Sequence, residues 1–122
     1  MNADYVFKQW EQHINAGDLS KVVGLYAKDA VLLGTFSKII CNSPDLIREY
    51  FIKIFQRKNL RVTFSSMESR CYSEIYLYSG MYEFSYEDKE LITIPARFTY
   101  AIGKDETGNY KIVEHHSSLI PN

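Results

Sequence analysis

The sequence contains few of the residues that cross-link a chain or interrupt regular structure. Its 122 residues include 2 cysteines, 3 prolines and 6 glycines. This excludes disulfide-rich miniproteins and collagen-like chains, which need far more of these residues. No apolar run approaches the roughly 20 residues that a membrane-spanning helix requires. The first residues lack the basic stretch and apolar core of a secretory signal, so we expect a cytoplasmic protein without a membrane partner.

The chain also lacks an excess of charge of either sign. Its 14 lysines and arginines nearly balance 15 aspartates and glutamates, which leaves a formal net charge of -1. Such a chain has no general field that would draw it to nucleic acid or to anionic lipid. We therefore expect no nucleic-acid partner.

Motifs for metals and cofactors are missing as well. Cys41 and Cys71 are thirty residues apart, and neither has a nearby cysteine or histidine at ligand spacing. Two reduced thiols are therefore favoured over a disulfide or a zinc site. The sequence contains no phosphate loop, nucleophile elbow or metal motif, so we expect no metal and no cofactor.

What the chain has is apolar and aromatic bulk. Hydrophobic residues make up 46% and aromatic residues 15%, with 10 tyrosines and 7 phenylalanines. A chain of this length can form one domain with a real core. We predict a single domain over residues 1–122.

Apolar periodicity divides the chain into helices followed by strands. The helical spacing predicts helices over residues 3–15, 19–26 and 44–56, with a short strand over residues 30–34 between the last two. After Asn59 the apolar period becomes two, which predicts long strands over residues 74–86, 91–102 and 110–118. This order predicts an α+β fold, with helices on one side of a curved antiparallel sheet.

Both faces of the strand over residues 91–102 carry bulk. Arg97 lies on the face of Thr93, Pro95 and Thr99, and the opposite face is rich in isoleucine. A solvated face should alternate with clearly polar residues. We therefore expect one face to contact the helices and the other to contact a second copy of the chain, in a homodimer or larger homo-oligomer.

The last predicted strand carries two adjacent histidines, His115 and His116. Neighbouring side chains of a strand point to opposite faces, so the two cannot bind one metal. Strict alternation places His116 on the side of Glu114 and Ile112. One histidine is then expected to face a pocket, and the other to face the surface or an interface.

The chain resembles the nuclear-transport-factor-2-like superfamily, in which helices and a strongly curved sheet form a cone. Within it, the sequence is similar to SnoaL-like proteins and to the association domain of calcium/calmodulin-dependent protein kinase II. The resemblance covers nearly the whole chain, and its most specific part is the stretch from His115 to Pro121. The other matching segments are residues 25–37, 47–51, 80–84, 96–100 and 111–114.

This resemblance implies a pocket inside the cone that holds a small anion. Arg97 matches the family's strand arginine, Arg48 the arginine of the preceding helix, and His116 the histidine of the last strand. Tyr82 stands where the kinase association domain has a further arginine, so that domain's ligand does not transfer directly. We expect Arg97, Arg48, His116, Tyr82 and Glu114 to line the pocket.

A buried Arg97 needs a partner, because an unpaired internal charge costs several kcal/mol. That partner is either Glu114 or the carboxylate of a ligand, which an arginine can hold with two hydrogen bonds. Should the isoleucine face prove to be the inner one, Arg97 becomes a surface or interface residue and this pocket is lost.

Three functions remain open from the sequence. The first is a self-associating domain that binds a small carboxylate. The second is a SnoaL-type isomerase, cyclase or dehydratase that uses His116 as base and Tyr82 as donor. The third is a purely structural oligomerisation module. Because no aspartate stands within a strand to act as base, the sequence favours binding over catalysis.

Overall fold

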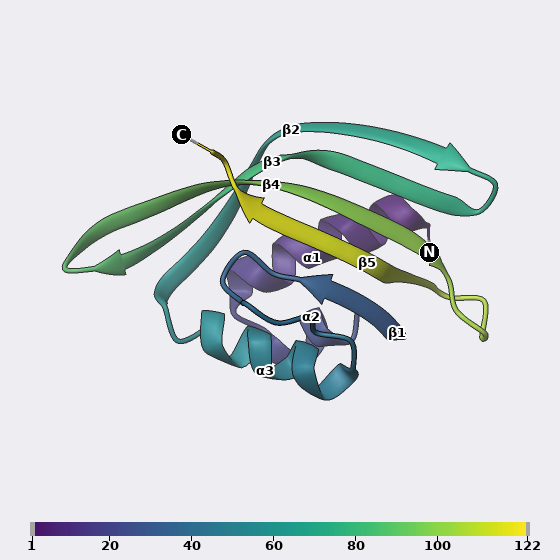
Figure 1. Cartoon of the computed structure of the whole chain (residues 1–122), viewed down its shortest axis with the longest axis horizontal. Helices are drawn as coiled ribbons and strands as arrows, with labels where there is room; N and C mark the ends of the chain where they lie inside the picture. The colour runs from purple at the N-terminus through teal and green to yellow at the C-terminus, as the bar shows by residue number, and fades with distance from the viewer. Residues whose placement is uncertain (1, 122) are drawn as a thin grey trace.

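The computed structural model describes residues 2–121 and folds them into helices followed by a sheet (Figure 1). No helix in this range is long and apolar enough to cross a membrane. In chain order the elements are α1 (Ala3–Ala16), α2 (Leu19–Val23), β1 (Tyr26–Leu33), α3 (Pro44–Ile54), β2 (Lys58–Tyr72), β3 (Ile75–Asp88), β4 (Glu90–Lys104) and β5 (Tyr110–Leu119).

Short polar side chains define where the helices begin. The side chain of Asn2 accepts a hydrogen bond from the backbone at the start of α1, and Asp18 and Ser43 do the same for α2 and α3. These bonds satisfy backbone N–H groups that have no partner within the helix. Gly17 ends α1 in the left-handed conformation with φ of 66°, which glycine adopts without strain.

The five strands form one sheet in the order β1-β5-β4-β3-β2. β1 runs parallel to β5, and the other neighbours are antiparallel. Figure 1 shows α1, α2 and α3 together on one side of this sheet. The predicted α+β class, with helices on one face of a mostly antiparallel sheet, is confirmed.

The first strand begins earlier than predicted. Residues up to Tyr26 were expected to be helical, but α2 ends at Val23 and Tyr26 is already in β1. The carbonyl of Leu25 accepts a hydrogen bond from the N–H of Ile112, at 2.8 Å. This pairing with β5 takes the backbone out of the helix, which overrides the helical spacing of the apolar side chains.

The isoleucine face of β4 is the inner face. Ala96, Phe98, Tyr100 and Ile102 are buried in the core, whereas Arg97 is exposed on the opposite side. The prediction that Arg97 lies inside the fold is therefore wrong. Both faces of β4 carry bulk, so alternation alone did not tell the inner face from the outer one.

A β-bulge in β5 reverses the expected placement of the two histidines. Ile102 of β4 pairs with Ile112, but the preceding Ala101 pairs with Glu114, so β5 contains one extra residue at this point. Such a bulge shifts the alternation by one. Ile112 and His115 both face the core as a result, and His116 faces solvent.

Candidate binding site

The residues predicted for the pocket do not come together. Arg97 and His116 line a shallow depression on the outer face of the sheet, where the Nε of Arg97 donates to the Oγ of Ser118 at 3.3 Å. Glu114 is half-buried opposite Ala101, further along the same pair of strands, so the Arg97–Glu114 pair, one of the two alternatives for a buried Arg97, does not form.

The two remaining predicted residues lie in two different environments. Arg48 is exposed on α3 and does not line the large hollow beside that helix. Tyr82 is buried in the core, with 1% of its surface exposed. The structure thus separates the five predicted residues among the outer sheet face, the surface of α3 and the core.

One large hollow, which we call the α3 hollow, lies between α3, the segment after β1 and Arg57. Its volume is about 490 Å³. The basic side chains of Lys38, Lys53 and Arg57 line it together with one acidic side chain, Glu49. Its apolar wall is formed by Phe36, Ile39, Leu46 and Ile54. The lining therefore combines apolar surface with an excess of positive charge.

Arg57 is the best-placed cation of this hollow. Its guanidinium carbon lies 4.3 Å from the centre of the Phe36 ring and 5.4 Å from that of Tyr86. Both contacts are within cation–π range and restrict the orientation of the guanidinium plane. Among residues 2–121, no carboxylate forms an ion pair with Arg57. Within these residues, the N–H groups of Arg57 therefore have no carboxylate partner.

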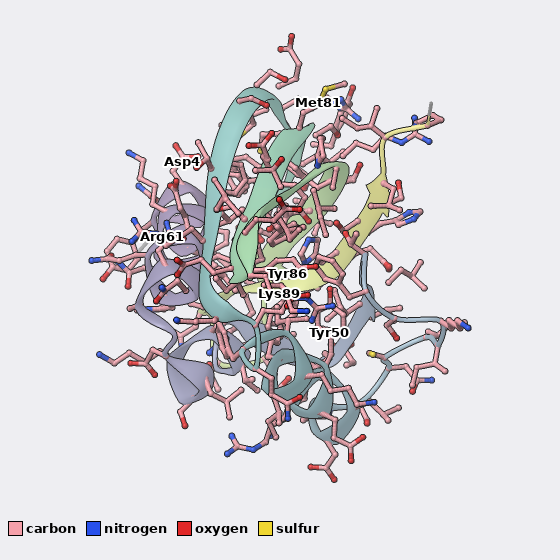
Figure 2. All side chains as sticks on the ribbon, turned by 90° about the vertical axis from the view of Figure 1, so that its left-hand side faces the viewer. Asp4, Tyr50, Arg61, Met81, Tyr86 and Lys89 are labelled. Carbon is pink, nitrogen blue, oxygen red and sulfur yellow. The ribbon has the colours of Figure 1, made fainter. Side chains whose placement is uncertain are left out.

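Tyr50, a buried residue of α3, lines the α3 hollow. In Figure 2 it is labelled beside this helix, with Tyr86 of β3 above it. A Cβ atom at Gly34 would overlap the Tyr50 ring, so a larger residue there would displace the phenol. Burial raises the pKa of Tyr50 to about 12, which keeps the phenol neutral at pH 7.

A chain of hydrogen bonds runs through the core on the inner face of the sheet. The Nε1 of Trp10 donates to the Oη of Tyr26 at 3.0 Å, and that oxygen lies 2.8 Å from the Nδ1 of His115. The Nε2 of His115 lies 3.2 Å from the Oη of Tyr82. The Tyr82 hydroxyl donates to the Oγ of Ser117 at 2.6 Å.

Ser117 continues the chain to Thr35, because their hydroxyl oxygens are hydrogen-bonded to each other. We call the whole chain the hydroxyl relay. It connects α1, β1, β3, β5 and the segment after β1. Its members, in order, are Trp10, Tyr26, His115, Tyr82, Ser117 and Thr35.

The direction of the relay from Trp10 to Ser117 follows from Tyr82. The Tyr82 hydroxyl has one proton and donates it to Ser117, so it accepts from the Nε2 of His115. A neutral imidazole has one donor and one acceptor, so the Nε2 of His115 carries the hydrogen and donates to Tyr82. The Nδ1 of His115 then accepts from the hydroxyl of Tyr26, which in turn accepts from the Trp10 indole.

Burial keeps His115 neutral. Desolvation, with a smaller contribution from the neighbouring His116, lowers the pKa of His115 to about 3. Its ring stacks on that of Tyr100, with 3.9 Å between the ring centres. Burial also raises the pKa of Tyr82 far above its usual value. At neutral pH the relay therefore holds no charge and has little tendency to acquire one.

Sequence reasoning missed several of these residues. Arg57 follows α3, but its aromatic partners come from distant segments, so no local spacing identifies it. His115 was assigned to the wrong face because the bulge is not visible as a motif. The one available indication was the pair of histidines itself, which required that one of them face inward.

Two tyrosine-to-phenylalanine substitutions test how much the hydroxyl relay contributes to stability. Tyr82→Phe removes a hydroxyl that bonds both His115 and Ser117, so it should lower the free energy of unfolding by about 1–3 kcal/mol. The matched control is Tyr100→Phe, because the Tyr100 hydroxyl is buried without a hydrogen-bond partner and its removal should be neutral or stabilising. Urea denaturation measures both, and equal losses would contradict the relay.

Comparison with known proteins identifies the fold family. Residues 4–122 match the family model of the SnoaL-like domain. No curated protein matches the sequence.

Solved structures agree with the family match. A protein from Xanthomonas campestris, assigned as a calcium/calmodulin-dependent protein kinase II association domain, is 29% identical with a TM-score of 0.87, over 98% of this chain and 86% of that one. A protein from Streptomyces avermitilis, assigned as a dehydratase of the NTF2-like family, is 10% identical with a TM-score of 0.86, over 99% and 95%.

A third structure shows the same fold in a protein with another assigned role. The ketosteroid isomerase-like protein from Erwinia carotovora is 14% identical with a TM-score of 0.79, over 98% of this chain and 94% of that one. Because proteins with different assigned roles share this fold, the fold alone does not determine the activity. The chain belongs to the SnoaL-like family and has the NTF2-like fold.

Proposed function

We propose that the protein is a binding domain for a small anionic molecule, and that the α3 hollow is its site. The observation that carries this proposal is Arg57, which is oriented by two aromatic rings and has no carboxylate partner among the described residues. Lys38 and Lys53 add positive charge, against the single Glu49. The NTF2-like fold is of a type that binds small molecules, which supports the same proposal.

The chemistry of the lining favours a carboxylate with an apolar body. A guanidinium can hold a carboxylate through two parallel hydrogen bonds. The apolar part of the ligand would lie against Ile39, Leu46 and Ile54. The volume of about 490 Å³ falls within the usual range of small-molecule sites, which is about 300–1,000 Å³. Substituted benzoates and short fatty acids have this combination of groups.

The placement of the predicted catalytic residues gives less support to an isomerase, cyclase or dehydratase. His116 faces solvent and Tyr82 faces the core, so the two do not act on one bound molecule. Within the α3 hollow, Glu49 is the only carboxylate and Tyr50 is a neutral phenol. Binding is therefore the better-supported function.

Replacing Arg57 tests the site. Arg57→Gln should weaken the binding of benzoate at least tenfold, which corresponds to about 1.4 kcal/mol, because the paired hydrogen bonds and the charge are both lost. Arg48→Gln is the matched control, since Arg48 is exposed on the neighbouring helix and should leave affinity unchanged. Calorimetric titration with benzoate, and with benzyl alcohol as the uncharged probe, measures these affinities.

Equal affinities of the unaltered protein for benzoate and benzyl alcohol would contradict the proposed site. The same holds if Arg48→Gln and Arg57→Gln weaken benzoate binding to the same extent. Circular dichroism of each variant shows whether the fold is retained.

We also propose that a second copy of the chain covers the outer face, by which we mean the side of β2–β5 opposite the helices. Met81 is exposed near its centre, and Figure 2 shows it on the far side of the sheet from α1. The strand pairings place Arg97 and His116 on this face together with Glu68 and Glu83. A two-fold axis can bring such opposite charges together, because the same patch meets itself.

Changing one apolar side chain tests this assembly. Met81→Lys should convert a dimer into a monomer, because it places a charge at the centre of the contact. Ile52→Lys is the control, because Ile52 on α3 is similarly exposed, at 40% against 44% for Met81. Sedimentation equilibrium at micromolar concentration measures the mass. A monomeric unaltered protein, or a dimer that persists in Met81→Lys, would contradict the assembly.

A further inference from the structure

The second half of β2 is a free edge of the sheet. β2 is the outermost strand on its side, as Figure 1 shows, and residues 65–72 are all exposed. Near its start the edge is covered, because the side-chain amide of Asn15 bonds the N–H of Val62 at 2.7 Å and its carbonyl at 3.2 Å. Among residues 2–121, no other segment forms such backbone hydrogen bonds to residues 67–71.

The register of the sheet shows which backbone groups of β2 point away from β3. In an antiparallel pair every second residue bonds the neighbouring strand, and the residues between them point outward. Val62 points outward, since it bonds Asn15, and it lies opposite Phe84 of β3. β3 itself pairs with β4 without a shift of register, so the alternation continues along it. Counting back from Phe84, every second residue of β3 lies opposite an outward-pointing residue of β2, and these are Phe64, Met67, Ser69 and Cys71.

The charges beside this edge match those of a second, antiparallel copy of it. Glu68 and Arg70 stand on either side of Ser69, and neither forms an ion pair within residues 2–121. When two copies of β2 lie antiparallel with their Ser69 residues opposite each other, Glu68 of each copy faces Arg70 of the other. A parallel arrangement in register would instead bring like charges together, which destabilises a strand pair.

The backbone groups fit the same arrangement. With the two Ser69 residues opposite each other, Met67 of each copy lies opposite Cys71 of the other. All three residues point outward, so they form hydrogen-bonded pairs with about six backbone bonds between the copies. We propose that a second copy of the chain occupies this edge, and that the two β2 strands pair antiparallel about Ser69 into one continuous sheet.

This edge contact goes beyond the proposed assembly through the outer face. The side chain of Ser69 lies on the helix side of the sheet, because its partner on β3 is the buried Tyr78. In an outer-face assembly the Ser69 side chains therefore point away from the other copy. The edge contact involves about seven residues from each copy, against about 20–30 in a stable interface. The association is therefore weak, and a covalent trap is the way to detect it.

A disulfide trap tests the edge contact. In a chain with Cys71→Ser, which removes the exposed native thiol, Ser69→Cys should form a disulfide-linked dimer. The Cα atoms of a hydrogen-bonded pair lie about 5.5 Å apart, which is within disulfide range. Ser66→Cys is the matched control, since this exposed serine of β2 would lie about 20 Å from its copy. Non-reducing electrophoresis during mild oxidation should show cross-linking at least tenfold faster for Ser69→Cys.

Charge reversal tests the register separately. Added to the Ser69→Cys chain, Glu68→Arg should slow cross-linking at least threefold, because arginines then face each other across the pair. Further addition of Arg70→Glu should restore the rate, because opposite charges face each other again.

Three results would overturn the edge contact. These are equal rates for Ser69→Cys and Ser66→Cys, a rate that Glu68→Arg leaves unchanged, and a rate that Arg70→Glu fails to restore. Should Ser69→Cys fail to fold, Met67→Cys in the chain with its native Cys71 decides. Mass spectrometry should then find position 67 of one copy linked to Cys71 of the other, because the two positions in one strand are about 13 Å apart. Sedimentation of Met81→Lys tests the outer face separately.

Discussion

A neutral imidazole in the core constrains the interior of this protein. His115 lies between the phenols of Tyr26 and Tyr82, with one ring nitrogen accepting and the other donating. A charged imidazole in this place would cost several kcal/mol, and an unpaired nitrogen would also be costly. The two phenols satisfy both nitrogens while the ring stays uncharged.

The hydrogen bonds of His115 also link parts of the fold that are distant in sequence. In this chain of hydrogen bonds, Trp10 belongs to α1, Tyr26 to β1 and Tyr82 to β3. Beyond Tyr82, the same hydrogen bonds reach Thr35, in the segment after β1, through Ser117. A change in the core can therefore alter the position of the Thr35 hydroxyl.

Much of the fold could be predicted from the sequence, because it follows from local patterns. The spacing of the apolar residues and the change of period after Asn59 located the helices and the sheet. The site could not be predicted in the same way. The predicted pocket was misplaced because a bulge in β5 reversed His115 and His116, and because bulk on both faces of β4 hid the exposure of Arg97.

Arg57 also could not be identified from local sequence patterns. Its position follows from Phe36 and Tyr86, which reach it from different elements. The family resemblance pointed to Arg48 and Arg97 instead, but both are exposed in the structure. The family's general property, a hollow for a small molecule, was thus easier to anticipate than the arginine that would serve it.

The most direct test of this account is the ionisation state and tautomer of His115. ¹⁵N NMR of imidazole-labelled protein, with His116→Gln to simplify the assignment, distinguishes the two ring nitrogens. The account predicts a neutral ring with the hydrogen on Nε2, unchanged from pH 7 down to about pH 4, since the pKa is lowered to about 3. A ring that titrates near pH 6.5, or one with the hydrogen on Nδ1, would contradict it.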